Sequence, residues 1–351
     1  MFNREEELEK FYDALKYASL IVIIGPRRTG KTSFMNVALV ESKHPHISLD
    51  MRGLPYNPSR VEIIRRLENA FNLIEKKWFS ALSETLRHVK GVSIVGSTIN
   101  FEWSRTGIDL ADLFDRIDNW ASKQNKRFLI AFDEIQLIRG DKSIPRLFAH
   151  VADTNHNITI VVTGSEFGLL FDFLGFENPN SPLYGRHYTE IFMRNFDFNE
   201  SKAFLMEGFR QVKIKTIEEA IDYAVQKLDG VAGWLTLFGV RCRDKNKCSK
   251  KIVDEVVVEG GKLARAETLK LTKLSRRYGM ILNFLATVSA ASWTQIKTTL
   301  EIKEKRSLPN PRIANLLNTL VKMSVIKKTN NGYAIADSIL LSGIKQDSLP
   351  E

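Results

Sequence analysis

The chain has 351 residues, of which 44% are hydrophobic and 26% charged, and these values fit a globular protein with two or three domains. We expect no membrane span, because no stretch is apolar for long enough. We expect no secretory signal, because the N-terminus is acidic. The two cysteines are too few for a disulfide framework or a zinc site. The net charge is +10, and all of the basic excess lies after residue 240. That part contains 21 Lys+Arg and 10 Asp+Glu, whereas residues 1–240 contain 30 Lys+Arg and 31 Asp+Glu.

This uneven charge has two interpretations, and both stay open. Lysine solubilises protein surfaces, so a solvated basic face is the simpler interpretation. The other is a surface that contacts a polyanion, DNA first. A membrane surface fits less well, because neither a lipidation motif nor a strongly amphipathic basic helix accompanies the charge. We expect a cytoplasmic location.

A phosphate-binding motif follows the first predicted elements, a helix over 5–17 and a buried strand over 20–24. Residues 25–32 are Gly-Pro-Arg-Arg-Thr-Gly-Lys-Thr, and a helix is expected to follow them. Glycines at both ends let backbone N–H groups turn toward phosphates, and the helix N-terminus adds a positive dipole. Lys31 would contact the β- and γ-phosphates, and Thr32 would place its hydroxyl on Mg²⁺. We therefore expect a nucleoside triphosphate to be bound by Gly25, Pro26, Arg27, Arg28, Thr29, Gly30, Lys31, Thr32 and Ser33.

Strands and helices alternate to about residue 195 and predict an α/β core. Strands are expected at 20–24, 46–50, 127–134, 158–165 and 188–196. Helices are expected at 59–89, 110–123 and 144–153, with a β-hairpin at 91–101 inserted among them. Because the strands are nearly all apolar, we predict a parallel sheet that helices cover on both faces.

Two carboxylates, Asp133 and Glu134, end the predicted strand 127–134, at the edge where ligands bind in doubly wound sheets. Asp133 would hold Mg²⁺, largely through water, and Glu134 would polarise the attacking water as general base. Thr163 ends the next strand and would approach the γ-phosphate or the water; a hydroxyl that satisfies a strand-end backbone group is an equal alternative. Arg186 would neutralise the charge on the transferred phosphoryl group, in a site of its own subunit or of a neighbouring one. The alternative is that Arg186 is an ordinary surface arginine.

The last third of the chain is helical over about 199–268 and then takes the layout of a winged helix. Helices are expected at 278–289, 294–301 and 312–322. A β-ribbon follows them, because apolar segments flank the turn sequence Asn330-Asn331-Gly332.

The third of these helices is the candidate recognition element. Polar residues recur on one of its faces at spacings of three and four: Arg312, Asn315, Asn318 and Lys322. Arginine and asparagine pair with guanine and adenine edges, and Lys327 and Lys328 on the ribbon could contact phosphates. Duplex DNA is therefore one candidate partner of the winged helix, and a docked protein is the other.

The N-terminal sequence Phe-Asn-Arg-Glu-Glu-Glu-Leu, together with GPRRTGKTS, FLIAFDEIQ, VVTGSEFG and SPLYGR, resembles the archaeal ATPase family within the AAA-like and signal-transducing P-loop NTPases. The resemblance covers residues 1 to about 195. It implies that adenine lies against Phe2, Asn3 and Arg4, and that Thr163 is the first sensor of the nucleotide. ATP rather than GTP is expected on that basis.

The resemblance also implies a helical lid after the core and a winged helix after the lid. The Gly-x-Pro-Gly-Trp-like turn of the lid has a counterpart at 230–234, where Ala232 stands in the place that proline often takes. This turn is therefore expected to sense the nucleotide less rigidly.

Together these features predict three domains: an AAA-like P-loop core at 1–195, an all-α lid at 196–268 and a winged helix at 269–351. We expect a slow ATPase that uses MgATP binding and hydrolysis to move its basic winged helix and acts on DNA. The alternative is a nucleotide-gated signalling switch whose winged helix docks a protein, and a ring-forming DNA loader or remodeller is a third class. The oligomeric state stays open.

Overall fold

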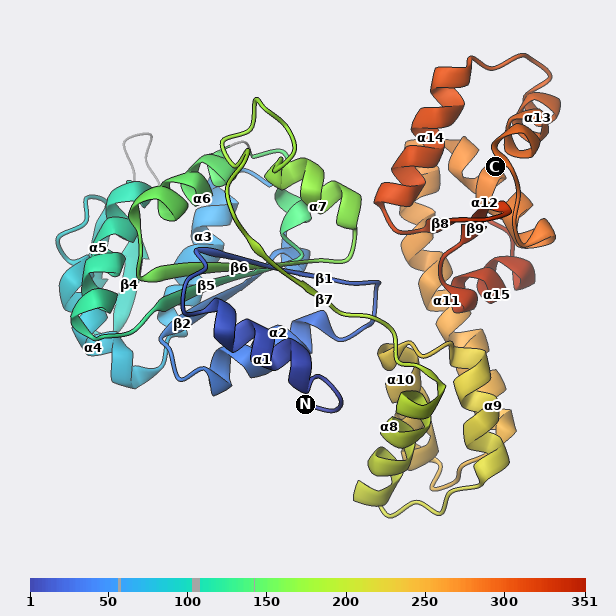
Figure 1. Cartoon of the computed structure of the whole chain (residues 1–351), viewed down its shortest axis with the longest axis horizontal. Helices are drawn as coiled ribbons and strands as arrows, with labels where there is room; N and C mark the ends of the chain where they lie inside the picture. The colour runs from blue at the N-terminus through green and yellow to red at the C-terminus, as the bar shows by residue number, and fades with distance from the viewer. Residues whose placement is uncertain (56–57, 103–107, 142) are drawn as a thin grey trace. The chain divides into compact units, whose positions relative to one another are not determined.

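The structure, a computed structural model, describes residues 1–55, 58–102, 108–141 and 143–351. It divides into two compact units (Figure 1). The first contains Met1–Gly25 and Lys31–Met193, and the second contains Pro26–Gly30 and Arg194–Glu351. Among the described residues, no helix combines the length and the apolar character that a membrane crossing requires.

The first unit is built on a five-stranded parallel sheet with the order β2-β5-β6-β1-β7. Its strands are β1 (Leu20–Ile24), β2 (His46–Asp50), β5 (Phe128–Asp133), β6 (Ile158–Gly164) and β7 (Thr189–Phe192). Every residue of β1, β5 and β6 is buried, as a parallel sheet with two covered faces requires. The predicted α/β fold with a parallel sheet is confirmed.

Helices cover both faces of this sheet, and the alternation along β1 separates the two cores (Figure 1). On one face, Ile21 and Ile23 pack with α1 (Glu5–Ala14) and α2 (Lys31–Glu41). The other face is covered by α3 (Arg60–Asn72), α5 (Leu110–Lys123) and α6 (Ser143–Thr154). The remaining elements of this unit are η1 (Met51–Gly53), α4 (Lys76–Leu86), β3 (Val92–Val95), β4 (Thr98–Phe101), η2 (Ile135–Ile138) and α7 (Phe167–Leu174).

Three details of the first unit differ from the sequence-based expectation. The stretch 59–89 contains two helices, α3 and α4, rather than one. Strand β7 is shorter than expected and ends at Phe192. Helix α7 was not predicted, because its sequence FGLLFDFL is apolar except for Asp172, and an apolar segment of eight residues does not distinguish a helix from a strand. The predicted hairpin is present, with β3 and β4 antiparallel.

The second unit is helical and ends in a winged helix. Its first helices are α8 (Phe198–Gln211), α9 (Glu218–Leu228), α10 (Ala232–Asp244) and α11 (Lys250–Leu274). The winged helix contains α12 (Arg276–Val288), α13 (Trp293–Glu304), α14 (Asn310–Lys322), β8 (Ile326–Thr329) and β9 (Gly332–Ile335), and is followed by α15 (Ser338–Gln346). The order of three helices and a β-ribbon is the one predicted.

The ribbon depends on a glycine at its turn. Strands β8 and β9 are joined by two residues, and Gly332, the first residue of β9, has a φ of +111°. A Cβ atom at this position would lie 2.2 Å from the carbonyl oxygen of Ala291, whose backbone pairs with Tyr333. Only glycine fits both the backbone conformation and this close approach.

A buried ion pair joins two helices of the winged helix. Arg277, in α12, donates from Nε and Nη2 to the carboxylate of Glu304, at the end of α13, over 2.6 and 2.7 Å. The two side chains are 6% and 1% exposed. The guanidinium lowers the pKa of Glu304 to about 2. The pair therefore fixes the contact between α12 and α13 and is costly to break.

Both cysteines belong to the second unit and lie close together. Cys242, in α10, and Cys248, in the loop that follows, are free thiols and are 0% and 1% exposed. The Cys242 thiol donates a hydrogen bond that lowers the pKa of Cys248 to about 7.

Candidate nucleotide-binding site

The loop from Gly25 to Gly30 connects the end of β1 to α2, which begins at Lys31. A Cβ atom at Gly25 would lie 2.2 Å from the carbonyl oxygen of Met193, so glycine is required there. The Thr29 hydroxyl donates to the Pro26 carbonyl over 2.9 Å and closes the loop. A tight glycine-bounded turn that leads into a helix N-terminus is the geometry that binds phosphate.

Lys31 is 5% exposed, and its ammonium donates to the Gly25 carbonyl over 2.9 Å. This contact folds the side chain back over the loop. The charge expected to meet the β- and γ-phosphates is thus held at the loop rather than in solvent. Ser33 follows in the first turn of α2.

Within the second unit, the two arginines of the loop contact residues of α10 and α11. Arg28 Nη2 lies 2.6 Å from Glu267 Oε1, and Arg27 Nη1 lies 3.4 Å from Oε2 of the same carboxylate. The Arg28 guanidinium also lies 4.2 Å from the centroid of the Trp234 ring, and its carbonyl accepts from the Gly233 N–H over 2.8 Å. The Gly-Trp pair of the predicted lid turn is therefore bound to a loop residue, although the turn lacks the usual proline.

Asp133, at the carboxyl end of β5, is the centre of the polar network in the first unit. Its carboxylate is 2% exposed and accepts from the Thr32 hydroxyl over 2.9 and 3.1 Å. The Thr163 hydroxyl, from β6, donates to it over 2.5 Å. The structure therefore brings together the two residues predicted as metal ligands and the predicted sensor, from three elements far apart in the sequence.

Arg52 completes this network and was not predicted. It lies in η1, just after β2, where the sheet register pairs Asp50 with Asp133. Its Nη2 lies 2.9 Å from Asp133 Oδ2, and its Nε and Nη2 donate to Asp50 over 2.9 Å each. These bonds lower the pKa of Asp50. The only sequence signal was a strand-end position, because the pairing of β2 with β5 was not known.

Glu134 is held in one orientation by three donors. Its Oε2 accepts from Gln136 Nε2 over 2.6 Å, from the Ser165 hydroxyl over 2.9 Å and from the Ser165 N–H over 3.2 Å. Its backbone has a φ of +56° and its N–H donates to the Thr163 hydroxyl over 3.0 Å. Thr163 thus satisfies a strand-end backbone group, which was one of the two expectations for it, and also donates to the carboxylate of Asp133.

Two further sets of predicted residues make contacts of their own. Arg186 donates from Nε and Nη2 to Asp153 over 2.9 and 2.6 Å, an ion pair in which its side chain is 32% exposed. Its guanidinium is therefore paired with Asp153 of the same unit. At the N-terminus, Phe2, Asn3 and Arg4 precede α1, and Arg4 is buried with an ion pair to Glu7 over 2.8 Å.

In the winged helix, α14 is amphipathic as expected. Its buried residues are Ile313, Leu316, Leu317 and Leu320. The six residues proposed for DNA contact are all exposed: Arg312, Asn315, Asn318, Lys322, Lys327 and Lys328.

The residues around Asp133 fit a magnesium ion. A carboxylate and a threonine hydroxyl are hard oxygen donors, which Mg²⁺ prefers, and here they lie within hydrogen-bonding distance of each other beside the phosphate-binding loop. The ion would share the Asp133 carboxylate with Arg52.

Comparisons with known proteins match both parts of the chain. The family described as "ATPase domain predominantly from Archaea" matches residues 1–238, and the "MCM protein C-terminal winged helix-turn-helix domain" matches residues 272–336. A solved Walker-type ATPase of Pyrococcus abyssi is 31% identical, with a TM-score of 0.82 over 98% of this chain and 96% of that chain. ORC2 of Aeropyrum pernix, solved as ADPNP–ADP complexes, shares the fold at 11% identity, with a TM-score of 0.66 over 98% and 94%. No curated protein matches the chain.

Proposed function

Because the chain belongs to the family of ATPase domains found predominantly in Archaea, we propose that it binds MgATP at the loop Gly25–Ser33 and hydrolyses it slowly. The observation that carries this proposal is the network in which Thr32, Asp133 and Thr163 meet at the carboxyl ends of β5 and β6. This edge is where doubly wound sheets bind nucleotides.

Each residue has a separate task in the proposed reaction. Thr32 and Asp133 would hold Mg²⁺, which when bound neutralises charge on the phosphates. Lys31 would leave the Gly25 carbonyl for the β- and γ-phosphates, and the loop N–H groups would bind the remaining oxygens. Glu134 would accept a proton from the attacking water, since one of its oxygens already bonds Ser165 and Gln136 and orients the other.

The adenine and arginine assignments extend the same proposal. Phe2, Asn3 and Arg4 would line the adenine, and Thr163 would relay the state of the γ-phosphate through Asp133 and the Glu134 N–H. Arg186 would have to leave Asp153 to reach a phosphate. We retain the division into a core at 1–195, a lid at 196–268 and a winged helix at 269–351.

Nucleotide binding is tested with Lys31→Ala, compared with Lys10→Ala on the exposed face of α1. We expect Lys31→Ala to weaken binding of a fluorescent ATP analogue by at least about tenfold, as loss of one charge-assisted phosphate contact predicts. The Lys10→Ala protein should bind like the wild type. Equal affinity of all three proteins would refute the assignment of the loop.

We further propose that the nucleotide state sets the position of the winged helix and that this domain contacts duplex DNA. Support comes from the exposed polar face of α14 and from the 21 Lys+Arg against 10 Asp+Glu after residue 240. Arg312 and Asn315 would contact base edges, and Lys327 and Lys328 would contact phosphates.

The DNA proposal is tested by duplex binding at low and moderate salt, with and without MgATP. Arg312→Ala should weaken binding by about tenfold, while Lys345→Ala, an exposed lysine of α15, should have a small effect. Absence of binding at low salt in every nucleotide state would favour the second candidate, a nucleotide-gated switch whose winged helix docks a protein.

A further inference from the structure

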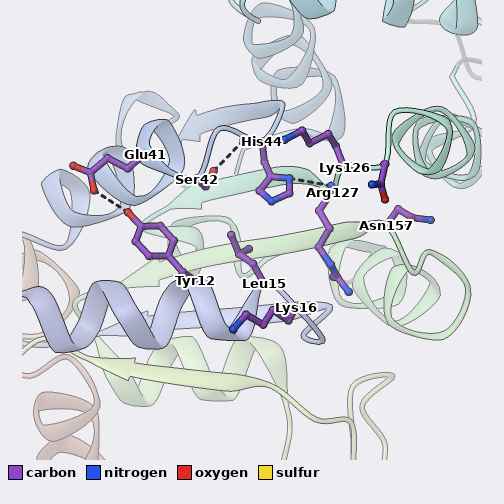
Figure 2. A pocket seen from close by; sticks show the side chains of 10 residues that line it. Tyr12, Leu15, Lys16, Glu41, Ser42, His44, Lys126, Arg127 and Asn157 are labelled. Carbon is purple, nitrogen blue, oxygen red and sulfur yellow. Dashed lines mark hydrogen bonds between the residues drawn. The ribbon is translucent and has the colours of Figure 1, made fainter.

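A second cavity lies in the first unit, at the edge of the sheet opposite the nucleotide-binding network. Its volume is about 630 Å³. It is lined by residues that precede β2, β5 and β6, and by the ends of α1 and α2 (Figure 2). Asp133 and Thr163 lie at the other ends of β5 and β6. This basic cavity is therefore separate from the ATP site and is not required by the proposed hydrolysis.

Positive groups predominate on its wall. Lys16, Lys126 and Arg127 line it together with His44, whereas Glu41 is the one carboxylate among the described lining residues. That carboxylate accepts a hydrogen bond from the Tyr12 hydroxyl over 2.9 Å, and Lys16 is paired with Asp13, outside the cavity, over 2.6 Å. Lys126 forms no ion pair with any residue that the structure describes. Asp118 lies near enough to Arg127 to act on the pKa of its guanidinium, so Lys126 is the cation of this wall that pairs with no carboxylate among the described residues.

Two of these groups are fixed by the fold. The Arg127 guanidinium is half-buried and donates from Nη1 to the Ala18 carbonyl over 3.0 Å and to the Thr159 hydroxyl over 2.8 Å. The backbone N–H of Arg127 donates to Nδ1 of His44 over 3.0 Å. Since Nδ1 is the acceptor, the neutral ring carries its proton on Nε2, which leaves that N–H as a donor.

The electrostatics around His44 agree with a cationic wall. Burial lowers the pKa of the imidazole, and the charges of Lys126 and Arg127 lower it further. Figure 2 shows the Lys126 and Arg127 side chains beside the ring, with Tyr12 and Leu15 across from it. An anion placed among these groups would find two full positive charges and one oriented N–H donor.

We propose that the basic cavity binds a small phosphate monoester with an aromatic or other apolar group. Lys126, Arg127 and His44 would bind the phosphate, because a doubly charged anion gains most from several cationic donors. The Tyr12 ring and Leu15 would cover the apolar group. The volume lies within the range of about 300 to 1,000 Å³ that small-molecule sites occupy. The ligand is thus a free small molecule, and it does not compete with ATP.

Phenyl phosphate is the probe, titrated calorimetrically into the full-length protein saturated with MgATP, so that the phosphate-binding loop is occupied. The same titration into Lys31→Ala protein without nucleotide provides an independent measurement. We expect saturable binding at one site in both cases. Lys126→Ala should weaken it by about tenfold or more, as loss of one charge-assisted contact predicts. Lys123→Ala, an exposed lysine three residues away that does not line the cavity, should bind like the parent.

Two comparisons make the proposal falsifiable. Inorganic phosphate should bind more weakly than phenyl phosphate, because it has no apolar group to contact Tyr12 and Leu15. Phenol should not bind measurably, because it lacks the charge of the phosphate. The NMR signals of His44 should report a raised imidazole pKa in the complex. Absence of saturable binding, equal binding by Lys126→Ala, or equal affinity for phenol would each overturn the proposal.

Discussion

Replacing Glu134 by glutamine should separate nucleotide binding from hydrolysis. Glutamine keeps a carbonyl oxygen that can accept the bonds from Ser165 and Gln136, so the side chain should retain its position. The three bonds lose their charge assistance, which should cost about 1–2 kcal/mol of stability in total. The amide cannot accept a proton from water, and loss of a general base lowers the rate by about 100- to 10,000-fold.

The assay combines single-turnover hydrolysis of radiolabelled ATP with equilibrium binding of an ATP analogue. We expect an affinity within about threefold of the wild type, together with the loss of rate given above. Glu177→Gln, at an exposed position of the same unit, is the matched control and should hydrolyse ATP normally. A Glu134→Gln protein that hydrolyses ATP within about threefold of the wild-type rate would refute the assignment of the general base.

Three other substitutions test features of both units. Thr163→Val removes the hydroxyl that donates to the Asp133 carboxylate and accepts from the backbone N–H of Glu134, and should lower single-turnover hydrolysis by about tenfold with ATP binding retained. An unchanged rate would count against a sensor role. Arg277→Ala leaves the buried Glu304 carboxylate with the exposed Arg306, 2.9 Å away, as its remaining cationic partner, and should cost about 2 kcal/mol in urea unfolding. The folded-state pKa of Glu304 is about 2, and its usual value is 4.5. The contribution of the pair to the free energy of unfolding should therefore be full above pH 4.5 and should disappear as the pH falls toward 2. The variant and the wild type should become equally stable there. Gly332→Ala should lower the unfolding temperature, because alanine is strained at a φ of +111°, whereas Gly239→Ala, a helical position with open space, should not.

The parts of the site that lie in one continuous segment could be predicted from the sequence. The phosphate-binding loop is a local motif between a strand and a helix, so its position and its role follow from residues 20–41 alone. Asp133 and Glu134 were found because an apolar strand ends at them. The carboxyl ends of parallel strands lie at one edge of a sheet, so the predicted sheet placed Asp133 and Glu134 near Thr163.

The parts that depend on register or on side-chain direction could not be predicted. Arg52 reaches Asp133 only because β2 pairs with β5, and the strand order is not written in any one segment. The contacts of Ser165 with Glu134 depend on the left-handed backbone at that glutamate. Helix α15, in contrast, had a readable signal, because Asp337 caps it by accepting from two backbone N–H groups.

The burial of both thiols gives this protein a practical property. Cys242 and Cys248 are the only cysteines in the chain, and neither is accessible to a bulky maleimide, even though the pKa of Cys248 is lowered. A cysteine introduced at an exposed position can therefore be labelled selectively in an otherwise native background. One spin label or fluorophore on each unit would turn the proposed nucleotide-driven movement into a measurable distance change, without removing a single natural residue from the core.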